Sequence, residues 1–192
     1  TEKLLDILDR YNVKATFFVT NGKPDYQNLI AQEAQRGHTV AIHSATHDYA
    51  KIYQSVDAYF ADFDEMNSII TAQTGKAADL VRFPGGSSNT ISKKYCYGIM
   101  SQLVCAVEER GFRYCDWNVS SGDAGGTTST SQVVANVIEG IKSNNVSVVL
   151  QHDIKNFSVD AVEQIIQWGL SEGYTFLPII STTPMSHHGV NN

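Results

Sequence analysis

The sequence predicts an α/β fold in which short parallel strands alternate with helices. Apolar runs rich in β-branched and aromatic residues recur along the 192-residue chain, and segments with helical apolar spacing separate them. Glycine marks many of the boundaries between these segments. Because helices separate the strands, we expect parallel neighbours joined by right-handed crossovers. Periodicity alone does not distinguish a closed barrel from an open sheet.

The first half of the chain shows this alternation from its start. Leu4, Leu5 and Leu8 recur at helical spacing, and a buried strand is expected to stop at Asn21-Gly22. A long amphipathic segment is closed by Gly75. The expected helices cover residues 2–11, 25–36 and 55–73, and the expected strands cover 15–20, 38–42 and 80–83.

The second half continues the pattern around one polar, glycine-rich loop at 120–131. A helix is expected to end at Gly111, and the strand after it runs to Trp117. The expected helices cover 97–110, 131–143 and 158–171, and the expected strands cover 112–117, 146–151 and 174–177.

Length and composition indicate one domain over residues 1–182, followed by a polar tail over 183–192. Forty-two per cent of the residues are hydrophobic, which is enough for a core. The 14 Lys and Arg against 20 Asp and Glu leave a net charge of −6, with no basic run, so we expect no nucleic-acid partner. No apolar stretch approaches the roughly 20 residues of a membrane-spanning helix.

A histidine pair follows the expected strand 38–42. His43 and His47 are four residues apart, so on a helical turn they share one face and both imidazoles can bind one metal ion. An exposed or capping pair is the alternative, and the position directly after a buried strand favours the metal site.

Other polar residues lie at the ends of further strands, where the sites of α/β proteins form. Arg82 lies in a buried strand and should need a carboxylate partner, and a Pro84-Gly85-Gly86 turn follows it. The Asp116-Trp117 segment ends the next strand, and Trp117 could fill the core or form the wall of a pocket. A later apolar strand leads to His152, which suits a general acid or base. Together these positions favour one convergent site.

In this order, the segments resemble the polysaccharide deacetylase family, the nodulation-protein-B homology domain. The resemblance covers residues 1 to about 180 and rests on segments that are specific only in combination. They are Ala15-Thr16-Phe17-Phe18-Val19, His43-x-x-x-His47, Arg82-Phe83-Pro84-Gly85-Gly86-Ser87, Asp116-Trp117-Asn118-Val119 and Leu150-x-His152.

The resemblance implies a distorted (β/α) barrel and a metal-dependent hydrolase that removes acetyl groups from glycans. It implies that His43 and His47 bind a divalent metal, most commonly Zn²⁺, with Co²⁺ or Ni²⁺ as alternatives. His152 resembles the general acid, and Arg82 resembles the arginine that holds the catalytic base. Trp117 and Leu150 resemble the walls of a pocket for the acetyl methyl group.

The remaining site assignments concern the turn and the partner of the acid. Backbone N–H groups near Pro84 and Gly85 could stabilise an oxyanion, so both are assigned to substrate binding. Asp123 is the assigned partner of His152, with Asp116 as the alternative, because the family's other acidic position in this segment is Ser120 here.

The sequence departs from the family at its start. The family's T-F-D-D-G-P motif, which carries the general base and a third metal ligand, belongs just upstream of the first helix. The chain therefore resembles an N-terminally truncated domain that lacks the first strand, and we expect the 192-residue polypeptide alone to bind metal weakly and to be nearly inactive.

The main functional hypothesis is a metal-dependent N-deacetylase of peptidoglycan or chitin-type glycans. The alternatives are an O-acetyl xylan esterase and a non-catalytic glycan-binding module that uses Trp117 as a stacking platform. Retention of Arg82 and His152 argues against the binding module. The expected partner is an acetylated glycan, the expected location is extracellular or cell-wall associated, and a monomer is expected.

Overall fold

The computed structural model describes residues 1–192, which form two compact units. The first unit comprises Thr1–Ala15 and Trp117–Pro178, and the second comprises Thr16–Asp116 and Ile179–Asn192. The predicted α/β class with parallel strands is confirmed. No helix is both long enough and apolar enough to span a membrane.

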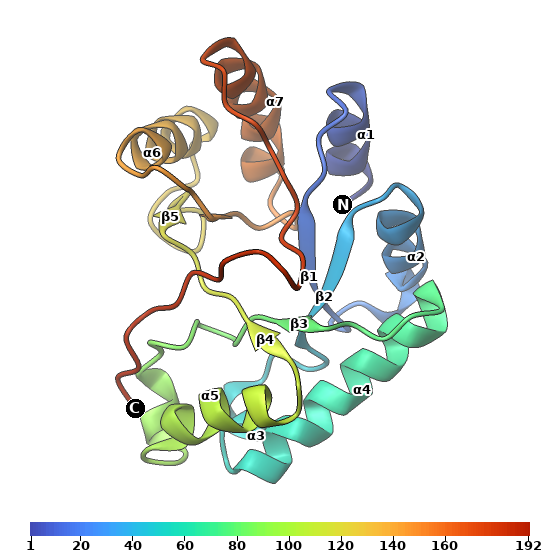
Figure 1. Cartoon of the computed structure of the whole chain (residues 1–192), viewed down its shortest axis with the longest axis vertical. Coiled ribbons are helices and arrows are strands. Elements are labelled where there is room, and N and C mark those ends of the chain that lie inside the picture. The colour runs from blue at the N-terminus through green and yellow to red at the C-terminus, as the bar shows by residue number, and fades with distance from the viewer. The chain divides into compact units, whose positions relative to one another are not determined.

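The second unit is built on a parallel sheet with the strand order β1-β2-β3-β4 (Figure 1). Phe17 and Val19 alternate with more exposed residues along β1, as expected for a strand with one buried face. The four strands are β1 (Thr16–Thr20), β2 (Thr39–Ser44), β3 (Leu80–Val81) and β4 (Arg113–Tyr114).

Helices α2 and α4 pack against each other and against β2 (Figure 1). The Ser55 hydroxyl caps α4 by accepting from the Ala58 N–H at 3.0 Å, and Gly75 ends the helix with φ of 76°. The helices of this unit are η1 (Pro24–Tyr26), α2 (Asn28–Gln35), α3 (Tyr49–Ile52), α4 (Val56–Thr74), η2 (Ile91–Lys94) and α5 (Ile99–Glu109).

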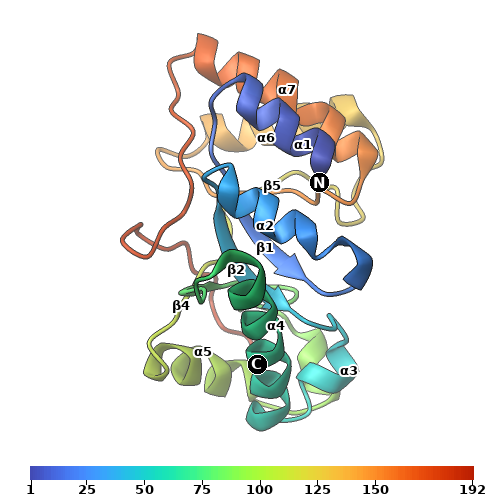
Figure 2. The ribbon, with the colours of Figure 1, turned by 90° about the vertical axis from the view of Figure 1, so that its right-hand side faces the viewer.

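The first unit is a helical layer beside a small parallel sheet. Helices α1, α6 and α7 lie side by side in Figure 2, and buried aliphatic side chains such as Val137 and Ile165 fill the space between α6 and α7. The elements are α1 (Glu2–Arg10), β5 (Val119–Ser120), α6 (Thr130–Lys142), β6 (Val149–Leu150) and α7 (Asn156–Ser171).

The strand expected over 174–177 is not formed. Phe176 packs against the cluster between α6 and α7, and its ring lies where a side chain on Gly169 would begin, 2.5 Å from that Cβ position. Tyr174 stacks at a tilt on Trp168. The apolar run is therefore explained by packing on helix α7 and not by strand pairing.

The predicted polar tail over 183–192 is hydrogen bonded to other segments of the second unit. Asn192 accepts from the Ser101 N–H at 2.7 Å and, through its side chain, from the Gly98 N–H at 2.8 Å, so it caps α5. His187 stacks on Tyr114 with a ring separation of 3.9 Å. Backbone hydrogen bonds and this ring contact therefore hold the polar tail in place.

Candidate functional site

The two histidines of the predicted metal pair lie together at the end of β2. Their ring centroids are 5.0 Å apart. His43 lies inside β2. The chain bends after the strand, and His47 itself has a positive φ of 53°. The expected helical turn is therefore wrong, although the pairing of the two imidazoles that it implied is present.

A buried carboxylate on α4 holds the backbone between these histidines. Asp62 accepts from the Ser44 hydroxyl and the Ala45 N–H at 2.7 and 2.9 Å through one oxygen. Its other oxygen accepts from the Thr46 N–H and hydroxyl at 2.8 and 2.7 Å. Sequence reasoning missed Asp62, and the available signal was one acidic residue on the apolar face of an amphipathic helix.

The His43 ring is oriented by a backbone carbonyl. Its Nδ1 lies 2.7 Å from the Arg82 carbonyl oxygen, which can only accept, so Nδ1 carries the proton. The lone pair then resides on Nε2, and this arrangement is typical of metal-binding histidines. The His43–His47 pair thus fits a divalent cation, while no group of three or more His, Cys, Asp or Glu side chains in residues 1–192 is placed to hold one.

Arg82 directly follows β3 and is buried, with its guanidinium against backbone oxygens. Nε donates to the Cys115 carbonyl at 2.8 Å and a terminal nitrogen donates to the Asp116 carbonyl at 3.0 Å. The guanidinium carbon lies 4.1 Å from the centre of the Phe18 ring. Burial lowers the pKa of Arg82, and the nearby Cys115 and Asp116 oppose this shift. The expected need for a charge partner is thus met in part by carbonyl oxygens and a ring face.

The predicted substrate turn after Arg82 is anchored from two sides. The Tyr53 hydroxyl donates to the Pro84 carbonyl at 2.6 Å. The Asp116 carboxylate accepts from both the N–H and the hydroxyl of Ser87 and from the His188 N–H. Asp116, the alternative partner of the acid, therefore holds this turn, and Tyr53 is a second residue that sequence reasoning missed.

Asp123 and His152 form a hydrogen-bonded pair in the first unit. Asp123 is 1% exposed and accepts from His152 Nδ1 at 2.7 Å and from the His152 backbone N–H at 2.7 Å. The Ser158 hydroxyl donates to the same carboxylate at 2.6 Å. Burial opposes ionisation of Asp123, but these hydrogen bonds outweigh it and lower its pKa to about 2. The carboxylate is therefore ionised and orients the ring so that Nε2 is the outer nitrogen.

Trp117 and Leu150 lie in the same unit as the Asp123–His152 pair. Both side chains are half-buried, Trp117 directly before β5 and Leu150 at the end of β6. The Leu150 carbonyl accepts from the Ser121 N–H, and this hydrogen bond joins the end of β6 to the residue after β5. The structure thus forms two groups of predicted residues, one in each unit, and their convergence stays a prediction.

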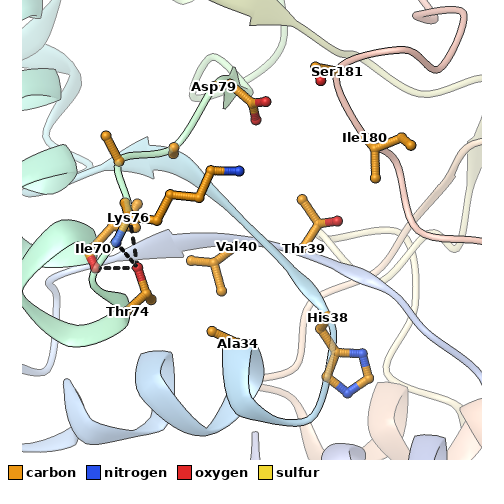
Figure 3. Close-up of a pocket in the computed structure, with 12 residues that line it drawn as sticks. Ala34, His38, Thr39, Val40, Ile70, Thr74, Lys76, Asp79, Ile180 and Ser181 are labelled. Atoms are coloured by element: carbon orange, nitrogen blue, oxygen red, sulfur yellow. Dashed lines mark hydrogen bonds between the residues drawn. The ribbon is translucent and has the colours of Figure 1, made fainter.

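A pocket of about 340 Å³ lies at the other end of the second unit's sheet (Figure 3). It is lined by His38 and Thr39, which precede and begin β2, and by Asp79, which precedes β3. In a parallel sheet this is the amino end of the strands, away from His43 and Arg82. None of the predicted site residues therefore lines this pocket.

Comparison with known proteins places this geometry in a known family. The model of the family described as Polysaccharide deacetylase matches residues 1–97. The chain is 69% identical to the crystallised catalytic domain of a peptidoglycan N-acetylglucosamine deacetylase from Eubacterium rectale, covering 100% of this chain and 87% of that one with a TM-score of 0.98. A polysaccharide deacetylase structure from Bacillus cereus is 29% identical, covering 97% and 88% with a TM-score of 0.83.

A curated relative extends beyond the matched region. A Bacillus cereus peptidoglycan-N-acetylglucosamine deacetylase is 31% identical over 182 residues, covering 92% of this chain and 63% of the relative. The chain thus spans less than two thirds of that protein. The family match over half of the chain and the similarity of its fold to solved members establish that this chain belongs to the polysaccharide deacetylase family.

Proposed function

We propose that the protein removes N-acetyl groups from amino-sugar glycans of the peptidoglycan type. The observation that carries this proposal is the hydrogen bond from His152 to the buried Asp123, because a protein that only binds glycans has no use for an oriented imidazole. The similarity to proteins described as peptidoglycan N-acetylglucosamine deacetylases supports the choice of substrate.

The His43–His47 pair would hold a divalent cation, and imidazole nitrogens suit Zn²⁺. A bound cation supplies Lewis acidity toward the acetyl carbonyl and makes water more acidic. The carbonyl of Arg82 fixes the His43 tautomer, and Asp62 holds the chain between the ligands. Residues 1–192 offer two imidazoles and no third nearby ligand, so we expect modest metal affinity from this segment alone.

His152 would act as the general acid. With Nδ1 donating to the ionised Asp123, a protonated ring carries its second proton on Nε2. That proton passes to the departing nitrogen as the C–N bond breaks, and the acetyl group leaves as acetate once water has added. Trp117 and Leu150 would contact the acetyl methyl group, and Arg82 would orient the general base.

The turn at Pro84 and Gly85 would stabilise the charge that develops on the acetyl oxygen. The Gly85 N–H donates no hydrogen bond within the protein, and Gly85 is exposed. An uncommitted N–H on a held turn is suited to an oxyanion.

Acetate release from peptidoglycan fragments by the zinc-loaded, full-length protein tests this function. We expect release that is lost in His152→Ala and is strongly reduced in Asp123→Asn. Acetylated xylan serves as the competing substrate, and faster release from it would replace the proposal with the esterase. Glycan binding with no acetate release from either substrate would instead support a non-catalytic glycan-binding module.

A further inference from the structure

We propose that Tyr53 is a positioning residue that aims the Gly85 N–H at the reacting acetyl oxygen. This inference rests on the proposed function, because it assigns a residue to the turn that would stabilise the oxyanion. Tyr53 touches neither the predicted metal ligands nor the predicted acid, and its hydroxyl reaches the turn through the Pro84 carbonyl.

The first step of the argument is the hydrogen bond between Tyr53 and the turn. The Tyr53 side chain is fully buried, and its hydroxyl donates to the Pro84 carbonyl at 2.6 Å. A bond of this length to a neutral acceptor is short and well formed. The Pro84 carbonyl is therefore directed into the aromatic core of the second unit.

The second step is the geometry of the peptide group. The chain contains no cis peptide bond, so the carbonyl of Pro84 and the N–H of Gly85 point in opposite directions from one planar unit. Because Tyr53 draws the carbonyl inward, the N–H must point outward. Gly85 is exposed although its neighbours Pro84 and Gly86 are buried, which agrees with this direction.

The third step is the location of Gly85 near the predicted metal pair. The Tyr49 hydroxyl oxygen lies 2.7 Å from the position that a Cβ on Gly85 would occupy. The Tyr49 ring in turn contacts the His47 ring, with centroids 5.7 Å apart. Gly85 is thus one side chain away from His47, and its positive φ of 80° suits glycine.

The fourth step is that the Tyr53 hydroxyl keeps the proton that it donates. Burial raises the pKa of Tyr53 far above its usual value of 10, and the neighbouring Tyr49 adds to this effect. The phenol is therefore neutral and keeps the proton that it donates to the Pro84 carbonyl.

The chain offers a matched control for this proposal. Tyr59 stacks on Tyr53, with centroids 6.3 Å apart and ring planes 10° apart, and is also buried. Its hydroxyl has no hydrogen-bond partner. Tyr59→Phe therefore removes a buried hydroxyl from the same cluster without touching the turn, while Tyr53→Phe releases the Pro84 carbonyl.

The kinetic experiment compares both variants with wild type in the full-length, zinc-loaded protein. We expect Tyr53→Phe to lower kcat about 10- to 100-fold, somewhat less than deleting an oxyanion-hole donor, with KM unchanged. Tyr59→Phe should match wild type in both parameters. Equal kcat in the two variants, or a change in KM alone, would overturn the proposal.

Two further measurements strengthen the test. The first does not depend on activity, and the second does not depend on the folding of Tyr53→Phe. The amide resonance of Gly85 in the metal-free protein should shift in Tyr53→Phe and stay in place in Tyr59→Phe, and an unmoved resonance would overturn the proposal. Replacing Gly85 by glycolic acid converts the amide to an ester, which removes the N–H and leaves Tyr53 intact. This ester should lose kcat at least as much as Tyr53→Phe, and an unchanged kcat contradicts the inference. Absence of acetate release by wild type would instead count against the proposed function.

Discussion

Replacing Asp62 by asparagine tests how the turn that carries the His43–His47 pair is held. Each oxygen of the Asp62 carboxylate accepts one backbone N–H and one hydroxyl. In Asp62→Asn, one of the two oxygens becomes an NH₂ group. The Ser44 or Thr46 hydroxyl bound there can rotate and accept from this NH₂, but the N–H of Ala45 or Thr46 loses its acceptor. A buried, unpaired donor costs about 1–3 kcal/mol, so we expect a loss of about 2 kcal/mol in the free energy of unfolding.

Chemical denaturation measures this loss, and zinc titration measures its effect on the site. We expect zinc affinity to fall by about 10-fold, because the segment between the two ligands is no longer fixed. Asp64→Asn is the matched control, since Asp64 lies on the same helix, is exposed and pairs with Arg110 at 3.2 Å. Its loss should stay below about 1 kcal/mol. Equal losses in Asp62→Asn and Asp64→Asn would refute the reasoning.

Three further predictions concern the two groups of site residues. Because hydrogen bonds lower the pKa of Asp123 from 3.8 to about 2, its ionised form stabilises the fold above pH 3.8 and loses this contribution as the pH falls toward 2. The stability gap between wild type and Asp123→Asn should thus be constant near neutral pH and narrow below about pH 4 in denaturation curves; a gap that persists at pH 2 would be inconsistent with this. His47→Ala should weaken zinc binding at least about 10-fold in calorimetry, because one of two imidazole ligands is lost, and unchanged affinity would remove His47 from the site. Gly85→Ala should lower Tm more than Gly75→Ala does, since both glycines have positive φ but only a Cβ at Gly85 meets the Tyr49 hydroxyl; equal Tm values would show that this contact is unimportant.

Much of the fold could be predicted because the buried faces are periodic. The apolar spacing of α4 and the alternation of Phe17 and Val19 in β1 reflect burial against one neighbouring layer. The run 174–177 has the same composition as a strand but packs on α7, and composition alone does not distinguish these environments. Asn192 illustrates the converse case, because its polar side chain caps a helix that lies far away in sequence.

The residues of the candidate site could be predicted where their side-chain type alone indicates their chemistry. Histidines near strand ends indicated the His43–His47 contact, and the family resemblance indicated the Asp123–His152 contact. Their orientation depends on groups distant in sequence, such as Asp62 and the carbonyl of Arg82, whose roles arise only from tertiary packing. The helical turn predicted at His47 was wrong for the same reason. Hydrogen bonds to Asp62, and one from the His47 N–H to the Ser44 hydroxyl, set the backbone conformation there.

The central claim is that the His43–His47 pair and the Asp123–His152 pair serve one reaction. The most direct test compares initial rates of acetate release by the zinc-loaded, full-length protein carrying His47→Ala, His152→Ala or both substitutions. Residues that act as a unit give non-additive losses, so the double variant should be about as slow as the slower single variant. A double variant whose loss equals the product of the two single losses, or a His152→Ala variant with wild-type rates, would contradict the account.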